Sequence, residues 1–540
     1  MTDLLAQAQA WLAEDPDPHT RDELQVLLDA DDQAALAIAF AGPLTFGTAG
    51  LRGPLGPGPA AMNHIVVAKA AAGLCQYVKD TGGARIVVGY DARRNSKAFA
   101  ELTAAIAAGA GLQAEVLPRN LPTPVLAYAI RARGADAGVV VTASHNPPQD
   151  NGYKVYLGDG MQIVPPADAE ISARIAAQPS YAQIPQSDAW TTLDETVVDE
   201  YLARVVSLAD PAHTGNARLT VVYTAMHGVG GALFETVCQR LGFVELHSVA
   251  EQFEPDPAFP TVAFPNPEEP GAMDLALAAA ERVDADLIIA NDPDADRCAV
   301  GIPTGDGWRM LRGDEVGVLL GWWQAQRGPV SGSLVTTIVS SSMLQTIAEA
   351  AGLGFRQTLT GFKWITRPDD IVYGYEEALG YCVDPDAVRD KDGISASVRM
   401  LELAAWLGNQ GRTVASLLDD LAAEHGVYLT DQISIRVQDL SDRDRALAAL
   451  QARPQDAIAD LAGVTDLTDS AATGLPPTEG LRLTLTGGGR VVARPSGTEA
   501  KLKVYLEVVE RTGDLAADRA RATARMLELR AGLERFLAAV

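Results

Sequence analysis

Short apolar runs alternate with helix-length segments along most of this 540-residue chain. Residues 84–90, 137–141 and 285–291 have the length and the β-branched content of buried strands, and segments of crossover length separate such runs. A strand, a crossover helix and a second strand form a βαβ unit, which builds a sheet covered by helices. The rhythm occurs three times, and each occurrence ends in a distinctive polar loop. We therefore expect an α/β protein with three consecutive βα-sheet domains of similar topology.

The pattern changes near residue 430. Residues 432–437, 481–485 and 490–494 alternate as half-buried strands do, and a long helical segment follows, which predicts a smaller C-terminal α+β domain. The first 40 residues are acidic and rich in Leu and Ala, which predicts a helical extension and not a signal peptide. The predicted parts, expected to surround a central cleft, are an extension (1–40), domain 1 (41–208), domain 2 (209–322), domain 3 (323–428) and domain 4 (429–540).

Charge excludes several classes of partner. The chain has 43 Lys and Arg against 70 Asp and Glu, a net charge of −27. Nucleic acids and anionic membranes need a basic face, so neither is expected as a partner. No apolar run approaches the ~18 residues of a membrane span. The four cysteines are far apart without CxxC spacing, which favours free thiols in a cytoplasmic protein. We expect a monomer or a dimer.

One stretch carries most of the chemical signal. In Thr142–Tyr156, Ser144 and His145 follow closely after a buried run. Turn-forming residues come next, and Lys154 lies on a second short strand. Ligands bind at the carboxyl ends of strands in open α/β sheets, so the three side chains are expected in one crevice. An ordinary turn with a capping serine remains the alternative. The stretch resembles the phosphoserine loop of the α-D-phosphohexomutases, the phosphoglucomutase and phosphomannomutase superfamily, and this resemblance implies that Ser144 carries a transferable phosphoryl group.

Asp292, Asp294 and Asp296 lie at alternate positions after another buried run. Carboxylates this close repel one another unless a cation neutralises them, and their oxygen ligands suit Mg²⁺. The segment resembles the superfamily's metal loop, Asp-Gly-Asp-Gly-Asp-Arg, with Pro293 and Ala295 in place of the glycines. The resemblance implies that the three aspartates and the Ser144 phosphoryl group hold the metal, with Arg297 near the substrate. A solvated acidic turn and the nucleophile loop of a haloacid-dehalogenase-type phosphatase are the alternatives.

Three further segments resemble parts of the same superfamily. Phe46–Pro54 is too rich in glycine for a helix or a central strand, and it resembles the arginine loop that brings Arg52 close to the phosphoserine. Glu376 and Glu377, read as a loop between Gly374 and Gly380, resemble the sugar-recognition loop Gly-Glu-Glu-Ser-x-Gly, although Ala378 replaces the serine. Residues 390–393 resemble a Lys-Asp-Gly motif in which Lys391 would be a general acid or base. Taken alone, each segment could be a connector, a helix start or a surface turn. We also expect substrate contacts from Thr360, Gly361 and Lys363.

The last motif runs from Arg494 to Lys503. Arginine forks, hydroxyls, loop N–H groups and lysines together can clamp a phosphate dianion. A plain turn is the alternative, and no Walker lysine pattern occurs. The segment resembles the superfamily's phosphate-binding loop, which implies substrate contacts from the following residues: Arg494, Ser496, Gly497, Thr498 and Lys503.

These features predict a phosphoglucomutase that interconverts glucose 1-phosphate and glucose 6-phosphate. The resemblance implies a phosphoserine enzyme, Mg²⁺ and a glucose 1,6-bisphosphate intermediate. Lys154, Lys391 or His145 would move the hydroxyl proton. A phosphopentomutase or a phosphomannomutase on the same scaffold is the main alternative, and a non-catalytic sugar-phosphate sensor is a more distant one.

Overall fold

The computed structural model describes residues 2–328, 330–436, 440–495 and 501–539. The chain divides into two compact units. Unit 1 contains residues 1–311 and 380–409, and unit 2 contains residues 312–379 and 410–540. Residues 380–409, with Lys391 among them, pack within unit 1, whereas residues 323–379 of predicted domain 3 belong to unit 2.

The N-terminal extension is helical, as predicted. Its helices are α1 (Thr2–Glu14), α2 (Pro18–Asp29) and α3 (Gln33–Ala39). Asp17 and Asp32 cap α2 and α3, since each carboxylate accepts a hydrogen bond from a backbone N–H of the first turn. Ala8, Leu24 and Leu36 meet in a small apolar cluster of their own.

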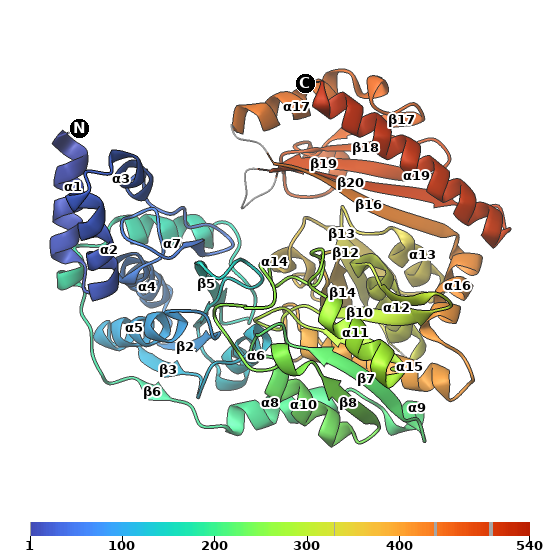
Figure 1. Cartoon of the computed structure of the whole chain (residues 1–540), viewed down its shortest axis with the longest axis horizontal. Helices are drawn as coiled ribbons and strands as arrows, with labels where there is room; N and C mark the ends of the chain where they lie inside the picture. The colour runs from blue at the N-terminus through green and yellow to red at the C-terminus, as the bar shows by residue number, and fades with distance from the viewer. Residues whose placement is uncertain (1, 329, 437–439, 496–500, 540) are drawn as a thin grey trace. The chain divides into compact units, whose positions relative to one another are not determined.

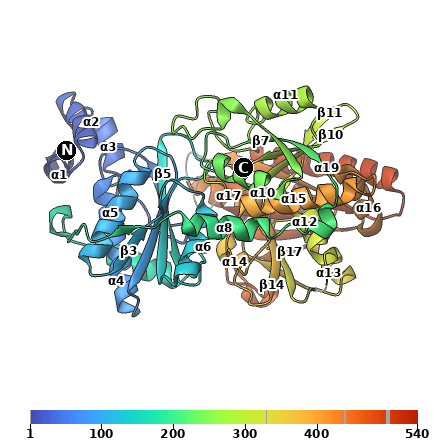
Figure 2. The same cartoon turned by 90° about the horizontal axis from the view of Figure 1, so that it is seen from below.

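The first sheet of unit 1 has the strand order β1-β5-β4-β2-β3-β6. Strands β4, β2, β3 and β6 are parallel neighbours, whereas β5 pairs antiparallel with both β4 and β1. Helices α4 and α5 lie on one side of this sheet and α6 on the other (Figures 1 and 2). The elements are β1 (Leu51–Pro54), α4 (His64–Asp80), β2 (Arg85–Tyr90), α5 (Ser96–Gly109), β3 (Gln113–Val116), α6 (Thr123–Arg133), β4 (Ala137–Val141), β5 (Asp150–Leu157), α7 (Ala167–Ala176), a 3₁₀ turn (Tyr181–Gln183) and β6 (Thr191–Thr192).

Local sequence explains these elements. Strand β4 is buried at all five positions, as expected for a strand covered on both faces. Each fully buried valine contributes roughly 1.5–3 kcal/mol of hydrophobic free energy. Helix α6 begins at Thr123-Pro124, where proline suits the first turn, and ends at Gly134 in the left-handed conformation.

The second sheet of unit 1 repeats this plan in the order β11-β10-β9-β7-β8. Strands β8, β7 and β9 are parallel, and β10 runs antiparallel to β9. The β4–β5 and β9–β10 connections therefore occupy equivalent positions in the two sheets. The elements are α8 (Thr196–Val206), α9 (Pro211–Thr214), β7 (Leu219–Thr224), α10 (Gly231–Leu241), β8 (Val244–Ser248), a 3₁₀ turn (Ala250–Gln252), α11 (Asp274–Val283), β9 (Leu287–Ala290), β10 (Ala299–Thr304) and β11 (Gly307–Met310). Unit 1 also contains β15 (Gly380–Cys382), which is not a strand of this sheet, and α15 (Gly393–Gly408).

Unit 2 contains a third parallel arrangement and an antiparallel sheet. Strand β12 pairs parallel with β13 and β14, whereas the last sheet, β16-β20-β19-β18-β17, is antiparallel throughout and is covered by α19 (Figure 1). The elements are α12 (Gly313–Gln326), β12 (Ser333–Thr337), α13 (Met343–Ala350), β13 (Gly354–Thr358), α14 (Phe362–Ile365), β14 (Ile371–Glu376), α16 (Val414–His425), β16 (Val427–Arg436), α17 (Leu440–Ala452), a 3₁₀ turn (Pro454–Asp456), β17 (Leu461–Asp466), α18 (Ser470–Thr473), β18 (Leu481–Leu485), β19 (Gly489–Pro495), β20 (Lys501–Glu510) and α19 (Leu515–Ala538).

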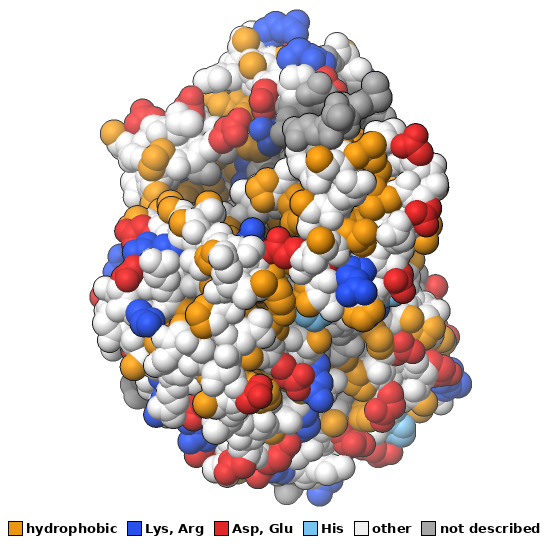
Figure 3. Space-filling model, turned by 90° about the vertical axis from the view of Figure 1, so that its left-hand side faces the viewer, with side chains coloured by type: hydrophobic (Ala, Val, Ile, Leu, Met, Phe, Trp, Pro, Cys, Tyr) orange, Lys and Arg blue, Asp and Glu red, His pale blue; other side chains and the backbone are white. Residues whose placement is uncertain are grey.

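Two further features concern the surface charge and the length of the helices. On the face drawn in Figure 3, lysine and arginine side chains of the described residues are scattered among aspartates and glutamates and do not merge into a basic surface. Among the helices of the described ranges, none combines the length and the apolar character that crossing a membrane requires.

Candidate active site

Ser144 follows β4 at the turn into β5, and its backbone is unusual. It adopts a φ of +52°, which is uncommon for a residue with a side chain. Its N–H donates to Thr142 Oγ1 at 2.8 Å, and its Oγ donates to Asp292 Oδ2 at 2.8 Å. His145 Nδ1 lies 3.1 Å from the same hydroxyl. The side chain of Ser144, which is buried, is thus aimed at the aspartate loop.

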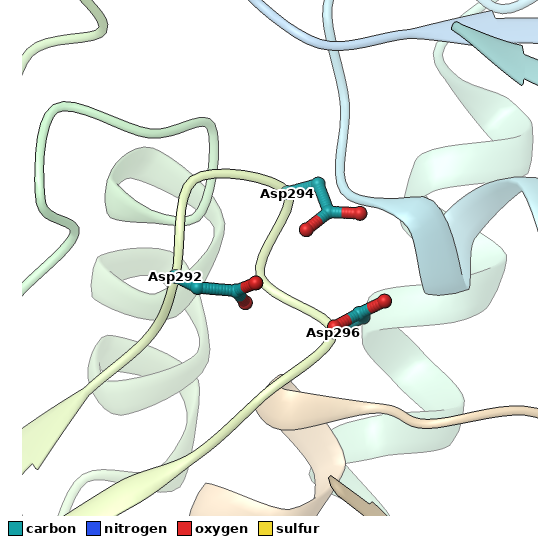
Figure 4. Close-up of side chains that lie close together, drawn as sticks. All are labelled: Asp292, Asp294 and Asp296. Atoms are coloured by element: carbon teal, nitrogen blue, oxygen red, sulfur yellow. The ribbon is translucent and has the colours of Figure 1, made fainter. Parts of the chain in front are cut away.

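The three aspartates lie on the equivalent β9–β10 connection. All three are fully buried, and one ligand oxygen of each lies within 4.8 Å of the others. Their carboxylates point into the same space (Figure 4). The predicted cluster of Asp292, Asp294 and Asp296 therefore exists, and its carboxylate oxygens are close enough together to hold a metal ion.

Two lysines offset the negative charge of this cluster. Lys154 Nζ, from β5, donates to Asp294 Oδ2 at 2.7 Å and to Asp296 Oδ2 at 3.0 Å. Lys391 Nζ lies 3.4 Å from Asp296 Oδ2. Both predicted lysines are therefore next to the aspartates and are themselves mostly buried.

The pKa values follow from this arrangement. Burial raises the pKa of Asp292, and the charges of Asp294 and Asp296 raise it further. Burial also opposes ionisation of Asp296, but Lys154 and Lys391 outweigh it and hold the pKa of Asp296 below its usual range. Burial alone would lower the pKa of Lys154, yet the carboxylates of Asp294 and Asp296 hold it above its ordinary value. Lys154 is therefore a cation at neutral pH.

His145 is affected in the opposite direction. Burial, followed by the charges of Arg297 and Arg52, lowers the pKa of His145 well below 6.5. The imidazole is therefore neutral at pH 7, and a neutral ring nitrogen beside a serine hydroxyl can accept its proton. Arg52, on β1, donates to Asn146 Oδ1 at 3.2 Å, which places it beside the Ser144 loop as predicted. Arg297 Nε lies 3.9 Å from Asp292 Oδ2.

The segment that carries Lys391 is fixed on both sides. Asp390 accepts hydrogen bonds from Tyr156 Oη at 2.6 Å and from Gln162 Nε2 at 2.8 Å. Asp392 caps α15 and accepts from Tyr201 Oη at 2.9 Å. Lys154 and Tyr156 are two residues apart on β5, so their side chains lie on the same face of the strand. That face therefore carries Lys154 itself and, through the hydrogen bond from Tyr156 to Asp390, also fixes the segment of Lys391.

The predicted sugar loop differs in part from expectation. Glu376 ends strand β14 and Gly374 lies inside it, so the first half of this segment is strand and not loop. The strand continues because β14 pairs in register with β12 up to Tyr375. Glu377 accepts hydrogen bonds from Ser340 Oγ at 2.8 Å and from Thr337 Oγ1 at 3.4 Å. Its carboxylate is therefore fixed by hydrogen bonds from the last residue of β12 and from the turn that follows β12.

The neighbouring predicted contacts lie together at the start of a short helix. Gly361 has a φ of +103° and precedes α14, and Lys363 is in its first turn. Thr360 comes immediately before Gly361 and is partly buried.

The predicted phosphate loop is described only at its two ends. Arg494 lies in strand β19 and Lys503 in strand β20, and they are directly opposite in the antiparallel register. Like charges at opposite positions destabilise a sheet unless an anion lies between them. Ser496, Gly497 and Thr498 lie outside the described residues.

Thr123 is a contact that sequence reasoning missed. Its Oγ1 donates to Asp294 Oδ2 at 2.6 Å, and its N–H donates to the Asp294 carbonyl at 3.0 Å. The Thr-Pro pair predicts only the start of α6. Nothing in the sequence indicates that this start meets a loop 171 residues further along the chain.

Two carboxylate oxygens provide a test for a metal ion. Asp294 Oδ1 and Asp296 Oδ1 are buried, and neither has a hydrogen-bond partner among the described residues. A buried oxygen without a partner is costly, and a hard divalent cation would satisfy both. The residues present therefore fit a site for such an ion.

Comparisons with known proteins identify the family. Profiles described as Phosphoglucomutase/phosphomannomutase, alpha/beta/alpha domains I, II and III and C-terminal domain match residues 43–182, 199–305, 312–425 and 433–524. A Haemophilus influenzae protein named "Probable phosphomannomutase" is 48% identical over 83% of this chain and 93% of its own length. The mouse protein named "Phosphopentomutase" is 33% identical over 93% of this chain and 90% of its own length.

A solved structure shares the fold. A phosphoglucomutase/phosphomannomutase family protein from Burkholderia thailandensis superposes with a TM-score of 0.71 at 21% identity, over 91% of this chain and 97% of that one. The four matched domains and the relatives together lead to one conclusion. The chain belongs to the phosphoglucomutase/phosphomannomutase family of the α-D-phosphohexomutase superfamily, and it is an intramolecular phosphotransferase of the mutase class.

Proposed function

We propose that this enzyme interconverts glucose 1-phosphate and glucose 6-phosphate, with Ser144 as the residue that stores the phosphoryl group. The observation that carries the proposal is the approach of the Ser144 hydroxyl to Asp292 within a buried, cation-lined cluster. Phosphoryl transfer depends mainly on positioning and on electrostatic stabilisation, and this cluster is built for both.

A divalent cation, Mg²⁺ in our proposal, would be held by Asp292, Asp294 and Asp296 beside Ser144. It would neutralise the charge that the phosphoryl oxygens bring toward the carboxylates. The two unpartnered oxygens, Asp294 Oδ1 and Asp296 Oδ1, support this assignment.

The transfer itself needs a nucleophile and a route for protons. The O6 hydroxyl of glucose 1-phosphate attacks the Ser144 phosphoryl group, so the Oγ–P bond breaks and the O6–P bond forms, while the O6 proton passes by way of His145 to the departing Ser144 Oγ. Glucose 1,6-bisphosphate then reorients, and Ser144 Oγ attacks its 1-phosphoryl group. The O1–P bond breaks, the Oγ–P bond forms again, and the proton of the Ser144 hydroxyl is handed on to the departing O1, which gives glucose 6-phosphate. Neutral His145 can accept a proton from the Ser144 hydroxyl in this return step.

Two lysines and Arg52 are assigned the remaining proton-transfer and electrostatic roles. Lys154 is cationic, so it acts as a proton donor and an electrostatic partner and not as a base. Lys391 and Arg52 approach the same cluster from separate segments, at Asp296 and at Asn146 respectively. We assign Lys391 to general acid or base catalysis and Arg52 to the charge on the phosphoserine.

Substrate recognition is assigned to residues of unit 2 and to Arg297 of unit 1. Arg494 and Lys503, which are opposed across two strands, would bind the phosphate group that is not reacting, together with Ser496, Gly497 and Thr498. Glu376 and Glu377 would accept hydrogen bonds from sugar hydroxyls, and Thr360, Gly361, Lys363 and Arg297 would add further contacts.

Mannose phosphates and pentose phosphates are second candidates for the substrate, because two relatives are named after them. The name of the Haemophilus relative supports mannose phosphates, and the name of the mouse relative supports pentose phosphates. Ala378 lies where the superfamily's sugar loop has a serine, and that difference bears on the choice. Values of kcat/KM for glucose, mannose, ribose and deoxyribose 1-phosphates, measured side by side with the bisphosphate activator, decide among them. The highest value for a sugar other than glucose would contradict the proposal.

Removing the proposed nucleophile tests the chemistry. Ser144→Ala is expected to lower kcat by at least about 10⁴-fold, as loss of a covalent nucleophile does. Intact-mass analysis should find one phosphoryl group on a fraction of the wild-type chain and none on the variant. Ser180→Ala, at an exposed site of unit 1, is the control and should behave as wild type. A phosphatase that used Asp292 as its nucleophile would keep its activity in Ser144→Ala and would release inorganic phosphate.

A further inference from the structure

Arg93 has no assigned role, yet it holds the backbone of the Ser144 loop. Its guanidinium donates to the carbonyl oxygens of Ser144 and Asn146, both at 2.6 Å, and to those of Pro147 at 2.8 Å and Asp150 at 3.2 Å. The residue is only 4% exposed. One buried side chain therefore gathers four carbonyl groups of a single loop.

Arg93 is itself fixed in place. Asp91 Oδ1 accepts hydrogen bonds from the Arg93 N–H at 2.9 Å and from Ser96 Oγ at 2.6 Å, and Asp91 Oδ2 lies 3.4 Å from Arg93 Nε. The planar guanidinium suits this task, because its N–H groups point in fixed directions toward several acceptors. The contacts favour the left-handed Ser144 backbone, which a loop without them would rarely adopt.

The other face of Arg93 meets a segment from the second sheet. The guanidinium carbon lies 4.9 Å from the centre of the Phe259 ring, a cation–π distance. Phe259 is 3% exposed and has a φ of +46°, so this ring is also held in a fixed position.

The Phe259 segment leads to the aspartate loop. The Asp256 N–H donates to the His227 carbonyl at 3.0 Å. The next residues after His227 pack on the aspartate loop: the Val229 N–H donates to the Pro293 carbonyl at 2.8 Å, and a Cβ on Gly228 would lie 2.3 Å from Pro293 Cα. A continuous set of contacts therefore runs from the Ser144 loop to Pro293 without using a reacting atom.

This route matters because the direct link cannot persist. The Ser144 Oγ hydrogen bond to Asp292 needs the hydroxyl proton, and a phosphorylated serine has none. Contacts through Arg93 and Phe259 involve carbonyl groups and a ring, which phosphorylation leaves unchanged.

We propose that Arg93 and Phe259 form a positioning bracket that fixes the Ser144 loop relative to the Asp292–Asp296 loop in both phosphorylation states. Neither residue touches the substrate. The effect on catalysis rests on the proposed function, whereas the effect on the loop does not.

The test compares Arg93→Lys with Arg94→Lys, the same change at the adjacent exposed arginine. A lysine amine cannot reach four carbonyls, so kcat for glucose 1-phosphate should fall on the order of 100-fold in Arg93→Lys, as for a small misplacement of reacting groups. KM should stay within about threefold, because the bracket makes no substrate contact. Amide hydrogen exchange in residues 142–150 should become about tenfold faster. Arg94→Lys should match wild type in all three.

Equal kcat, or equal exchange of residues 142–150, in the two variants would overturn the bracket. If Arg93→Lys does not fold, Phe259→Leu decides. We expect it to lower kcat about tenfold and to speed the same exchange, since the ring face is lost while Arg93 remains; wild-type behaviour would overturn the proposal. An inactive wild-type chain would refute the proposed function alone, and the exchange comparison would still decide whether Arg93 fixes the loop.

Discussion

In unit 1 the buried carboxylate of Asp296 lies beside cations, whereas in unit 2 the buried carboxylate of Asp314 lies beside neutral donors. Lys154 and Lys391 hold the pKa of Asp296 below its usual range. Asp314 instead accepts hydrogen bonds from the Ser341 N–H at 2.6 Å and from Tyr375 Oη at 3.0 Å, and burial raises its pKa to about 7. Asp296 is therefore ionised near neutral pH, whereas Asp314 is about half protonated.

This difference separates two tasks. A carboxylate that stays charged when buried is ready to bind a cation, and it requires the surrounding lysines. The carboxylate of Asp314 instead accepts hydrogen bonds from a backbone amide and a phenol, and so fixes the turn at 340–342. Ser340, in the same turn, donates a hydrogen bond to Glu377. Changes in unit 1 should therefore act on kcat and metal binding, and changes in unit 2 on stability and sugar preference.

Among the variants that compare the two units, the largest effect is expected at Asp294. Asp294→Asn should lower kcat by about 10²- to 10³-fold, because a buried charge beside the reacting phosphoryl group is lost. Wild-type protein should be stabilised by roughly 2.7 kcal/mol at Mg²⁺ concentrations 100 times the Kd, and the variant should lose this gain in a thermal titration. Asp284→Asn, at the exposed end of α11, is the control. Full activity in Asp294→Asn would contradict the metal assignment and the claim that changes in unit 1 act on kcat.

The next effect concerns Asp314 and pH. Its folded pKa of about 7 lies above the unfolded value of 3.8, so the stability it contributes is complete below pH ~4 and is lost as the pH rises to 7. Asp314→Asn avoids this loss while keeping the acceptor oxygen. Its advantage over wild type in the free energy of unfolding should grow by about 2–3 kcal/mol between pH 5 and pH 8. Urea denaturation at both values measures it, with exposed Glu528→Gln as the control, and an advantage that is independent of pH would contradict the assignment.

A smaller effect is expected at Thr123. Thr123→Val removes the hydroxyl that donates to Asp294 and keeps the side-chain shape. A hydrogen bond to a charged group is worth about 1.5–3 kcal/mol, so kcat should fall by roughly tenfold or more. Thr103→Val, a buried site on α5, should alter stability without lowering kcat. If both variants lowered kcat alike, the contact at Asp294 would have no special role.

The smallest effect is expected at Ala378. Ala378→Ser supplies a hydroxyl beside Glu377, and it should change the ratio of kcat/KM for glucose and mannose 1-phosphates by about threefold. Because unit 1 is untouched, the amount of phosphorylated Ser144 should not change. Ala423→Ser on α16 is the matched control. A change in Ser144 phosphorylation would contradict the proposal that changes in unit 2 act on sugar preference without acting on the chemistry of unit 1.

Much of the fold could be predicted because its signals are local. The α/β class, the three repeated βα arrangements and the C-terminal α+β domain are confirmed. Helix α6 is bounded by such local signals, since Thr123-Pro124 starts it and Gly134 follows its last residue. The domain boundaries and the central cleft stay predictions. Strand ends were harder: β14 runs to Glu376 because its partner β12 extends the pairing, which the local Gly-Tyr-Glu-Glu sequence does not indicate.

The candidate site was predictable where one segment carries the pattern. Ser144 and the three aspartates were found in this way, and the structure brings them together. Thr123 and Arg93 were missed, because their partners lie 171 and 51 residues away and neither belongs to a recognisable motif. The roles of all these residues remain proposals that the experiments above address.

Transfer from Ser144 in a single turnover tests the central claim most directly. Phosphorylated enzyme is mixed with glucose 1-phosphate and Mg²⁺, quenched, and analysed for phosphoryl content at Ser144 and for sugar bisphosphate. The account predicts that each phosphoryl group lost from Ser144 appears as one glucose 1,6-bisphosphate. Product formation while Ser144 keeps its phosphoryl group, or with the label on Asp292, would contradict it.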